Sequence, residues 1–311
     1  MTKLSGGILK KGDVINDTYS VQCFIGQGAF GEVYRVKHKY LGQQVLKVFK
    51  PEYVESSDID TITKEALILS HLTHSNIVRV FETNIFKKKK MSCFFLTMGF
   101  VSGESLAQLL KRKISLSVQV SCSIQLAFLK GLATVHKNDP PIIHRDISPD
   151  NILLSYDTEK AHALLSDFGL AQSIDQVSHL SDAAGKLLYF APECFWGVYL
   201  PASDVFSAGI VFYRMITGCH PWNYDFDNLD SNDSENFTTM IIKSRKKEPL
   251  PPSYYNEECD EEIDRIILKS LSKELESRYQ NANEFLSDLL VEGKKTKTKL
   301  KQEGFVEQLY Y

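Results

Sequence analysis

The chain has 311 residues, of which 43% are hydrophobic and 24% charged, a composition typical of a folded protein with one large or two small domains. Lysine and arginine number 36 against 39 aspartate and glutamate residues, a formal net charge of −3, so we expect no nucleic-acid partner. We also expect no membrane span, because the most apolar stretch, 205–213, ends at Arg214 and is far shorter than the roughly 20 apolar residues that a span requires.

The cysteines and the first residues of the chain indicate the cellular compartment in which the protein is expected. The six cysteines are scattered and form no Cys-x-x-Cys pair, which predicts neither a zinc site nor a disulfide framework. The opening residues contain no apolar segment of the kind found in secretion signals. Both features favour a cytoplasmic protein with reduced thiols.

Residues 19–99 predict a small β-rich domain, preceded by an extension at 1–18. Five runs rich in β-branched and aromatic residues are separated by turns, and apolar residues at helical spacing from Ile62 to Leu72 predict one helix between them. Four consecutive lysines, 87–90, are expected to form a solvated hairpin turn. The five predicted strands are 21–26, 32–39, 43–50, 77–86 and 91–98.

Residues 100–292 predict a larger helical domain. The polar and acidic stretch 223–236 is expected to be an exposed loop, and the lysine-rich segment 293–311 a mobile tail. The fold class predicted from these patterns is α+β, with a small β-rich domain joined to a helical one. The predicted helices are 117–136, 204–217, 261–272 and 281–291.

Gly26, Gly28 and Gly31 form a Gly-x-Gly-x-x-Gly pattern followed by Val33. A dinucleotide-binding fold needs a helix directly after such glycines, whereas this sequence continues as a strand. A glycine-rich hairpin that lies over phosphate groups is therefore the better interpretation, because glycine lets backbone N–H groups approach phosphate oxygens.

Charged residues further along the chain complete a candidate phosphate site. Lys47 lies on a predicted strand, and Glu65 on the following helix is placed to hold its ammonium group toward a phosphate. The run from His144 to Asn151 contains Asp146, and Asp167 follows within Asp-Phe-Gly. Asn151 and Asp167 offer oxygen ligands suited to Mg²⁺, which leaves Asp146 to accept the proton of an attacking hydroxyl group.

In this order, the motifs from Tyr19 to Leu290 resemble those of eukaryotic-type (Hanks-type) serine/threonine protein kinases, and the spelling of the His-Arg-Asp run resembles bacterial members. The resemblance implies a bilobal protein-kinase fold, with a β-rich N-lobe carrying one key helix and a larger helical C-lobe. It implies transfer of the γ-phosphate of ATP, with Mg²⁺ or alternatively Mn²⁺, to serine or threonine of protein substrates, including the chain itself. A secreted effector acting in a host cytosol is the alternative location.

The resemblance also assigns roles to individual residues. The three glycines would cover the phosphates, Lys47 would bind the α- and β-phosphates with Glu65 as its partner, and Asp146 would be the catalytic base. Asn151 and Asp167 would hold the metal. Met98 would be the gatekeeper, Gly99 and Val101 would offer backbone groups, and Leu153 would close the pocket. The residues expected around adenine are Ile25, Val33, Val45, Met98, Gly99, Val101 and Leu153.

Later motifs separate protein kinases from small-molecule phosphotransferases, the third class considered. By the resemblance, Glu193 of Ala-Pro-Glu pairs with Arg278, and Asp204 braces the backbone of the His-Arg-Asp run. By the resemblance, Arg145 would pair with a phosphate on the activation segment, 167–193, at Ser178 or Ser181, unless that segment is ordered without modification.

Several positions depart from the family pattern. Ser148 stands where serine/threonine kinases carry lysine, and Lys186 stands where they carry threonine. Together with Val45 in place of alanine, they support a pseudokinase that acts as a binding or scaffolding module, although the complete phosphoryl-transfer set argues against it. Because these two positions face each other in the family, we expect Lys186 to bring the missing ammonium group beside the γ-phosphate.

Overall fold

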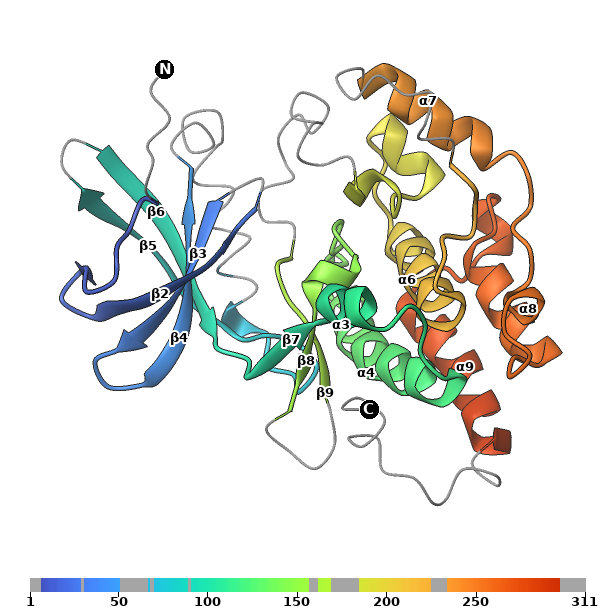
Figure 1. The fold of residues 1–311 in the computed structure, drawn as a ribbon, viewed down its shortest axis with the longest axis horizontal. Coiled ribbons are helices and arrows are strands. Elements are labelled where there is room, and N and C mark those ends of the chain that lie inside the picture. The colour runs from blue at the N-terminus through green and yellow to red at the C-terminus, as the bar shows by residue number, and fades with distance from the viewer. Residues whose placement is uncertain are drawn as a thin grey trace. The chain divides into compact units, whose positions relative to one another are not determined.

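A computed structural model gives the fold of the chain (Figure 1), which divides into two compact units. Unit 1 comprises the described residues up to Val101, and unit 2 comprises those from Ser102 onward. The structure describes residues 7–28, 31–50, 67, 70–88, 91–156, 162–168, 185–224 and 234–296.

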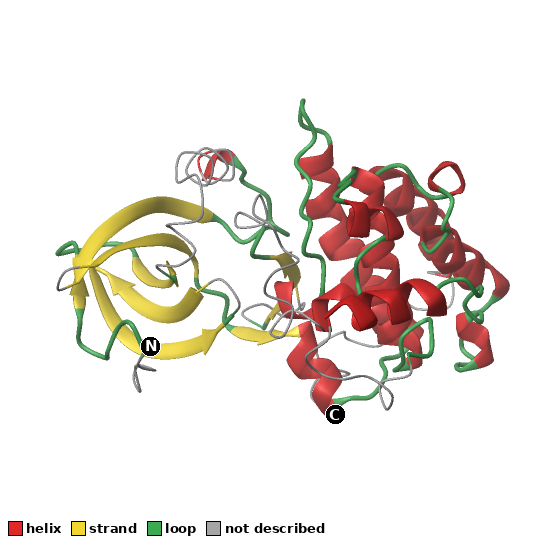
Figure 2. Cartoon of the chain, turned by 90° about the horizontal axis from the view of Figure 1, so that it is seen from above, coloured by secondary structure: helices red, strands yellow, loops and turns green. Residues whose placement is uncertain are grey.

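Unit 1 is built on one curved antiparallel sheet with the strand order β1-β2-β3-β4-β6-β5 (Figure 2). Alternate side chains of β3 and β4 are buried on one face, as the period of a half-buried strand requires. Each of the five predicted runs overlaps one of these strands. The strands are β1 (Val14–Ile15), β2 (Tyr19–Gln27), β3 (Gly31–His38), β4 (Gly42–Phe49), β5 (Val80–Lys88) and β6 (Met91–Gly99).

Two details of unit 1 differ from the predictions. β5 begins at Val80 rather than at residue 77. Lys87 and Lys88 belong to β5 and not to a turn, because Lys88 still pairs with Met91 of β6 and its Nζ lies 2.6 Å from the Asp13 carboxylate. Most of the predicted helix at 62–72 lies outside the described residues.

The segment before β2 packs on the sheet. Leu9 and Ile15 are buried in its core. The N–H of Leu9 donates to the hydroxyl of Tyr34 at 2.9 Å, and the N–H of Ile8 donates to the Glu32 carboxylate at 2.6 Å. Residues 7–15, assigned above to an extension, therefore share the core of unit 1.

Unit 2 combines a small sheet of strand order β7-β8-β9 with helices. The N-cap of α4 is Ser117, whose side chain accepts the N–H of Val120, so the predicted start at 117 is confirmed. The elements of unit 2 are β7 (Gly103–Ser105), α3 (Leu106–Arg112), α4 (Val118–His136), η1 (Pro149–Asn151), β8 (Ile152–Ser155), β9 (His162–Leu165), η3 (Pro192–Trp196), α6 (Pro201–Thr217), α7 (Ser234–Ser244), η4 (Pro252–Tyr254), α8 (Glu261–Ser270), η5 (Leu275–Ser277) and α9 (Ala282–Thr296).

The core of unit 2 is α6, which packs against α4, α8 and α9. Almost every residue of α6 is buried, and the helix ends at Gly218, whose φ of +76° favours glycine. α9 continues to Thr296, so the prediction of a mobile tail is wrong for 293–296, and α7 begins inside the stretch predicted as a loop.

α4 bears on the question of a membrane span. Among the helices in the described part of the chain, α4 alone is long and apolar enough to cross a membrane, judged by length and composition. The core helix of a soluble protein passes the same test, and 56% of its most apolar window is buried within the structure. The observation is therefore only weak evidence for a span.

Candidate active site

Asp204 on α6 fixes the backbone at the start of the His-Arg-Asp run. Its buried carboxylate accepts the N–H groups of His144 at 2.7 Å and Arg145 at 2.9 Å. It also accepts a hydrogen bond from Nε2 of His136 at 3.0 Å, because Nδ1 of that ring is occupied by the N–H of Ala282. Arg145 has a φ of +64°, a left-handed conformation that costs free energy unless its surroundings hold it. The bracing role expected for Asp204 is observed.

His144 connects Asp146 to the end of β9. Its Nδ1 accepts the N–H of Asp146 at 3.3 Å, and its Nε2 donates to the carbonyl of Ser166 at 3.0 Å. Burial lowers the pKa of His144, so the ring stays neutral near pH 7 with its proton on Nε2. The ring of Phe168 lies 4.5 Å from it between centroids. One neutral imidazole thereby contacts Asp146, Ser166 and Phe168.

Asn151 orients the carboxylate of Asp146. Its Nδ2 donates to both the backbone carbonyl and Oδ2 of Asp146, at 2.7 and 2.8 Å. Because the amide nitrogen is committed to these two acceptors, the amide oxygen of Asn151 is left for another ligand. Ser166 donates its N–H and its hydroxyl to the carbonyl of Asn151, at 2.9 and 3.1 Å, which brings the residue before Asp167 against Asn151.

Lys186 also reaches Asp146. Its Nζ forms an ion pair with Oδ2, the oxygen that Asn151 already contacts, so Oδ1 of Asp146 has no hydrogen-bond partner among the described residues. Burial alone lowers the pKa of Lys186, but the carboxylates of Asp146 and Asp167 outweigh it and leave the pKa raised. Ser148, two residues after Asp146, is buried, and its hydroxyl makes no hydrogen bond within the described chain. The ammonium group is thus placed on the expected base rather than on the Ser148 hydroxyl.

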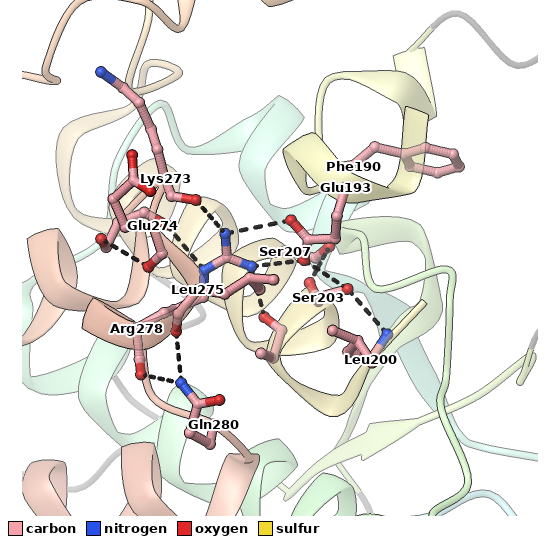
Figure 3. Close-up of polar contacts among 12 residues, drawn as sticks. Phe190, Glu193, Leu200, Ser203, Ser207, Lys273, Glu274, Leu275, Arg278 and Gln280 are labelled. Atoms are coloured by element: carbon pink, nitrogen blue, oxygen red, sulfur yellow. Dashed lines mark hydrogen bonds and ion pairs between the residues drawn. The ribbon is translucent and has the colours of Figure 1, made fainter. Parts of the chain in front are cut away.

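The segment that follows Lys186 is anchored by a buried ion pair (Figure 3). Nη1 of Arg278 donates to Glu193 at 2.8 Å and to the carbonyl of Ala202 at 3.1 Å, with its side chain fully buried. Ser203 adds a hydrogen bond to the same carboxylate oxygen at 2.7 Å. The predicted pairing of Glu193 with Arg278 is confirmed.

Tyr189 is structural, as the motif suggested. Its hydroxyl contacts Arg214, and its backbone carbonyl accepts the hydroxyl of Ser207 at 2.7 Å. Burial raises the pKa of Tyr189 to about 12, so the phenol stays protonated at neutral pH. The candidate phosphorylation sites Ser178 and Ser181 lie outside the described residues.

In unit 1, the glycine-rich run forms the β2–β3 hairpin. A Cβ at Gly31 would lie 2.2 Å from the carbonyl oxygen of Val48, which real Cβ atoms essentially never do, so this position requires glycine. Gly26 and Gly28 have open space where a Cβ would be. The N–H of Gly28 donates to the carbonyl of Gly31 at 2.9 Å, and residues 29–30 lie outside the described chain.

One face of the unit 1 sheet gathers the predicted nucleotide residues. Val33 pairs with Lys47 across β3 and β4, and Val45 pairs with Met98 across β4 and β6. Directly paired residues and residues two apart share a face, so these four side chains lie on one face of the sheet. This face is only half-buried, because the residues between them on β3 and β4 point to the opposite face and fill the core there. Glu65, the expected partner of Lys47, lies outside the described residues.

The remaining predicted adenine contacts are more scattered. Ile25 on β2 is 50% exposed. The N–H of Gly99 donates to the carbonyl of Arg79 at 2.9 Å, so a nucleotide contact at Gly99 has to use its carbonyl oxygen. Val101 is the last described residue of unit 1, and Leu153 lies on β8 of unit 2.

Known proteins resemble this chain in sequence over most of its length. A protein of Clostridium perfringens named as a probable serine/threonine-protein kinase is 30% identical over 283 residues, which cover 89% of this chain and 38% of that protein. The serine/threonine-protein kinase PrkC of Bacillus subtilis is 25% identical over 283 residues, covering 89% and 41%. The chain therefore spans about two fifths of the length of these relatives.

The fold agrees as well. The kinase domain of PknI from Mycobacterium tuberculosis matches with a TM-score of 0.67 at 22% identity, over 92% of this chain and 99% of that one. The predicted α+β bilobal fold is thereby confirmed. The family model of the protein kinase domain matches residues 19–291. With nearly nine tenths of its residues inside that match, the chain belongs to the protein kinase domain family.

Proposed function

We propose that this chain transfers the γ-phosphate of ATP to serine or threonine hydroxyl groups of proteins, its own included. The similar proteins carry the name of serine/threonine kinases, and nothing in their names favours the pseudokinase alternative. The buried pair of Glu193 and Arg278 argues against a small-molecule phosphotransferase. We keep the cytoplasm as the proposed location.

The geometry of Asp146 carries the proposal. Its Oδ2 accepts from Asn151 and Lys186, whereas Oδ1 has no partner among the described residues. A carboxylate held by one oxygen presents the other in a defined direction, where it would accept the proton of a substrate hydroxyl as that hydroxyl attacks phosphorus.

Asn151 and Asp167 would hold the divalent cation. The amide nitrogen of Asn151 is committed to Asp146, so its oxygen is the ligating atom, and Asp167 adds a carboxylate, which is the oxygen donor set that Mg²⁺ or Mn²⁺ prefers. Among the described residues, no cluster of three or more His, Cys, Asp or Glu could hold a metal. When bound, the cation neutralises charge on the phosphates.

The nucleotide contacts of unit 1 follow from its half-buried face. We assign Lys47 to the α- and β-phosphates with Glu65 as its partner, and the glycine-rich hairpin to the phosphate cover. We assign Val33, Val45 and Met98 to adenine because they share the face that carries Lys47. Ile25, Gly99, Val101 and Leu153 complete the proposed set.

Lys186 would supply the cation that position 148 lacks. Its ammonium group contacts the proposed base and keeps its charge well above neutral pH. A fixed positive charge beside that base stabilises the charge that spreads over the phosphoryl oxygens in the transition state.

An ATP-turnover assay with the purified protein, Mg-ATP and a generic protein substrate tests the proposal. Phosphoserine or phosphothreonine on the substrate or on the chain itself is the expected result. Nucleotide binding without transfer would instead support the pseudokinase, and transfer only to small hydroxyl compounds would support the third class.

A further inference from the structure

Arg245 is a buried cation that the proposed reaction does not use. It follows the last residue of α7 and is only 4% exposed. Its Nη2 donates to the backbone carbonyl of Leu188 at 2.7 Å, and its Nη1 donates to the carbonyl of Phe190. Its Nε lies 3.4 Å from the hydroxyl of Tyr224. The two arms of one guanidinium group therefore hold two carbonyl groups of the same short segment.

The surroundings of this charge are unusual because they include no carboxylate at ion-pair distance among the described residues. Three aromatic rings surround the guanidinium carbon instead, those of Trp222, Phe206 and Phe195, at 5.2, 5.3 and 5.8 Å from their centroids. Burial lowers the pKa of Arg245. Burying an unpaired charge costs free energy, which cation–π contacts and two carbonyl acceptors offset. An apolar side chain would fill this site at a lower cost in free energy. The presence here of an arginine that contacts two carbonyl groups therefore needs an explanation.

The segment that Arg245 holds begins at Lys186. The chain turns tightly there, with the N–H of Tyr189 donating to the carbonyl of Lys186 at 2.9 Å. From Leu188 onward, three successive carbonyl groups are held by side chains from elsewhere in unit 2. Those of Leu188 and Phe190 are held by Arg245, and that of Tyr189 is held by Ser207. The backbone that carries Lys186 is thus clamped within two residues of its ammonium-bearing side chain.

We infer that Arg245 is a positioning residue that keeps Lys186 in contact with Asp146. The inference rests on the proposed function, because it assigns Arg245 a part in catalysis only through Lys186. Arginine is suited to this task, since its planar fork holds two acceptors at once, whereas lysine offers a single ammonium group to both.

The test is Arg245→Lys, which keeps the positive charge but removes the fork. We expect kcat for a protein or peptide substrate to fall about 10- to 100-fold, the scale of a misplaced catalytic group, with KM for ATP changed less than about twofold. Amide hydrogen exchange in residues 187–190 should become faster. Arg265→Lys, an exposed arginine on α8, is the matched control and should change none of these quantities.

A double-mutant cycle with Lys186→Met separates positioning from a purely structural role. If Arg245 acts through Lys186, Arg245→Lys should lower kcat by less than about twofold in the Lys186→Met background. An equal loss in both backgrounds, or an unchanged kcat in Arg245→Lys alone, would overturn the inference. Full activity of Lys186→Met by itself would instead show that the proposed role of Lys186 is wrong, so the two failures are distinguishable.

Discussion

Replacing Lys186 by methionine should impair phosphoryl transfer far more than nucleotide binding. Methionine keeps a long unbranched side chain but removes the ammonium group that contacts Asp146. The proposed role of that group is to stabilise charge that develops in the transition state, so its loss should appear in kcat and leave KM for ATP nearly unchanged.

The magnitude follows from the surroundings of the charge. Losing one donor to a developing oxyanion costs about 2 to 4 kcal/mol in other enzymes. The side chain of Lys186 is 31% exposed, so solvent screens part of its field and the lower half of that range applies. A loss of about 2 to 3 kcal/mol corresponds to a decrease in kcat of roughly 30- to 160-fold.

Steady-state kinetics with varied ATP and a fixed protein substrate measure this effect. Lys130→Met, which removes a lysine from an exposed position on α4, is the control and should leave kcat unchanged. The double variant Ser148→Lys with Lys186→Thr should recover activity relative to Lys186→Met. A near-normal kcat in Lys186→Met would refute the reasoning, because the ion pair with Asp146 would then have no catalytic consequence.

Three further predictions concern other contacts. Gly31→Ala should destabilise the glycine-rich hairpin by about 1 to 3 kcal/mol and raise KM for ATP, because its Cβ meets the Val48 carbonyl, whereas Gly26→Ala, with open space, should leave the melting temperature unchanged. Arg278→Met leaves the Glu193 carboxylate without its buried partner, so calorimetry should show a loss of about 3 to 5 kcal/mol, or roughly 6 to 20 °C. Ser148→Ala removes a buried hydroxyl without a partner, so denaturant unfolding should show unchanged or slightly higher stability, and a large loss would reveal a missed contact.

The parts of the fold with strong local signals were predictable from the sequence. The apolar residues within the strand runs and within the long amphipathic helices recur with periods that each fit only one type of secondary structure. α3 was missed because its seven residues are too few to show a period, although the capping pair Ser105 and Gln108 marks its start. Lys88 was misplaced in a turn because its charge suggested solvent, whereas strand pairing and Asp13 keep it in β5.

The candidate site also contains residues that the sequence predicts and residues that it does not. Asp146 and Asn151 stand five residues apart in one motif, so the family pattern assigned them together, and Asp204 and Arg278 followed from the same pattern. Arg245 carries no such signal, because its carbonyl partners lie 55 and 57 residues earlier in the chain and are backbone groups that any residue type provides. Only the folded backbone reveals that contact.

Mass spectrometry of the purified protein incubated with and without Mg-ATP tests the central claim most directly, when wild type is compared with Asp146→Asn and Asp17→Asn. Asp17 is an exposed carboxylate of unit 1, so its variant removes the same charge away from Asp146 and should incorporate phosphate like the wild type. Asp146→Asn should slow incorporation by about 10² to 10⁴, the contribution of a positioned acid–base group, at an unchanged melting temperature. Undiminished phosphate incorporation in a folded Asp146→Asn protein would contradict the assignment of Asp146 as the catalytic base.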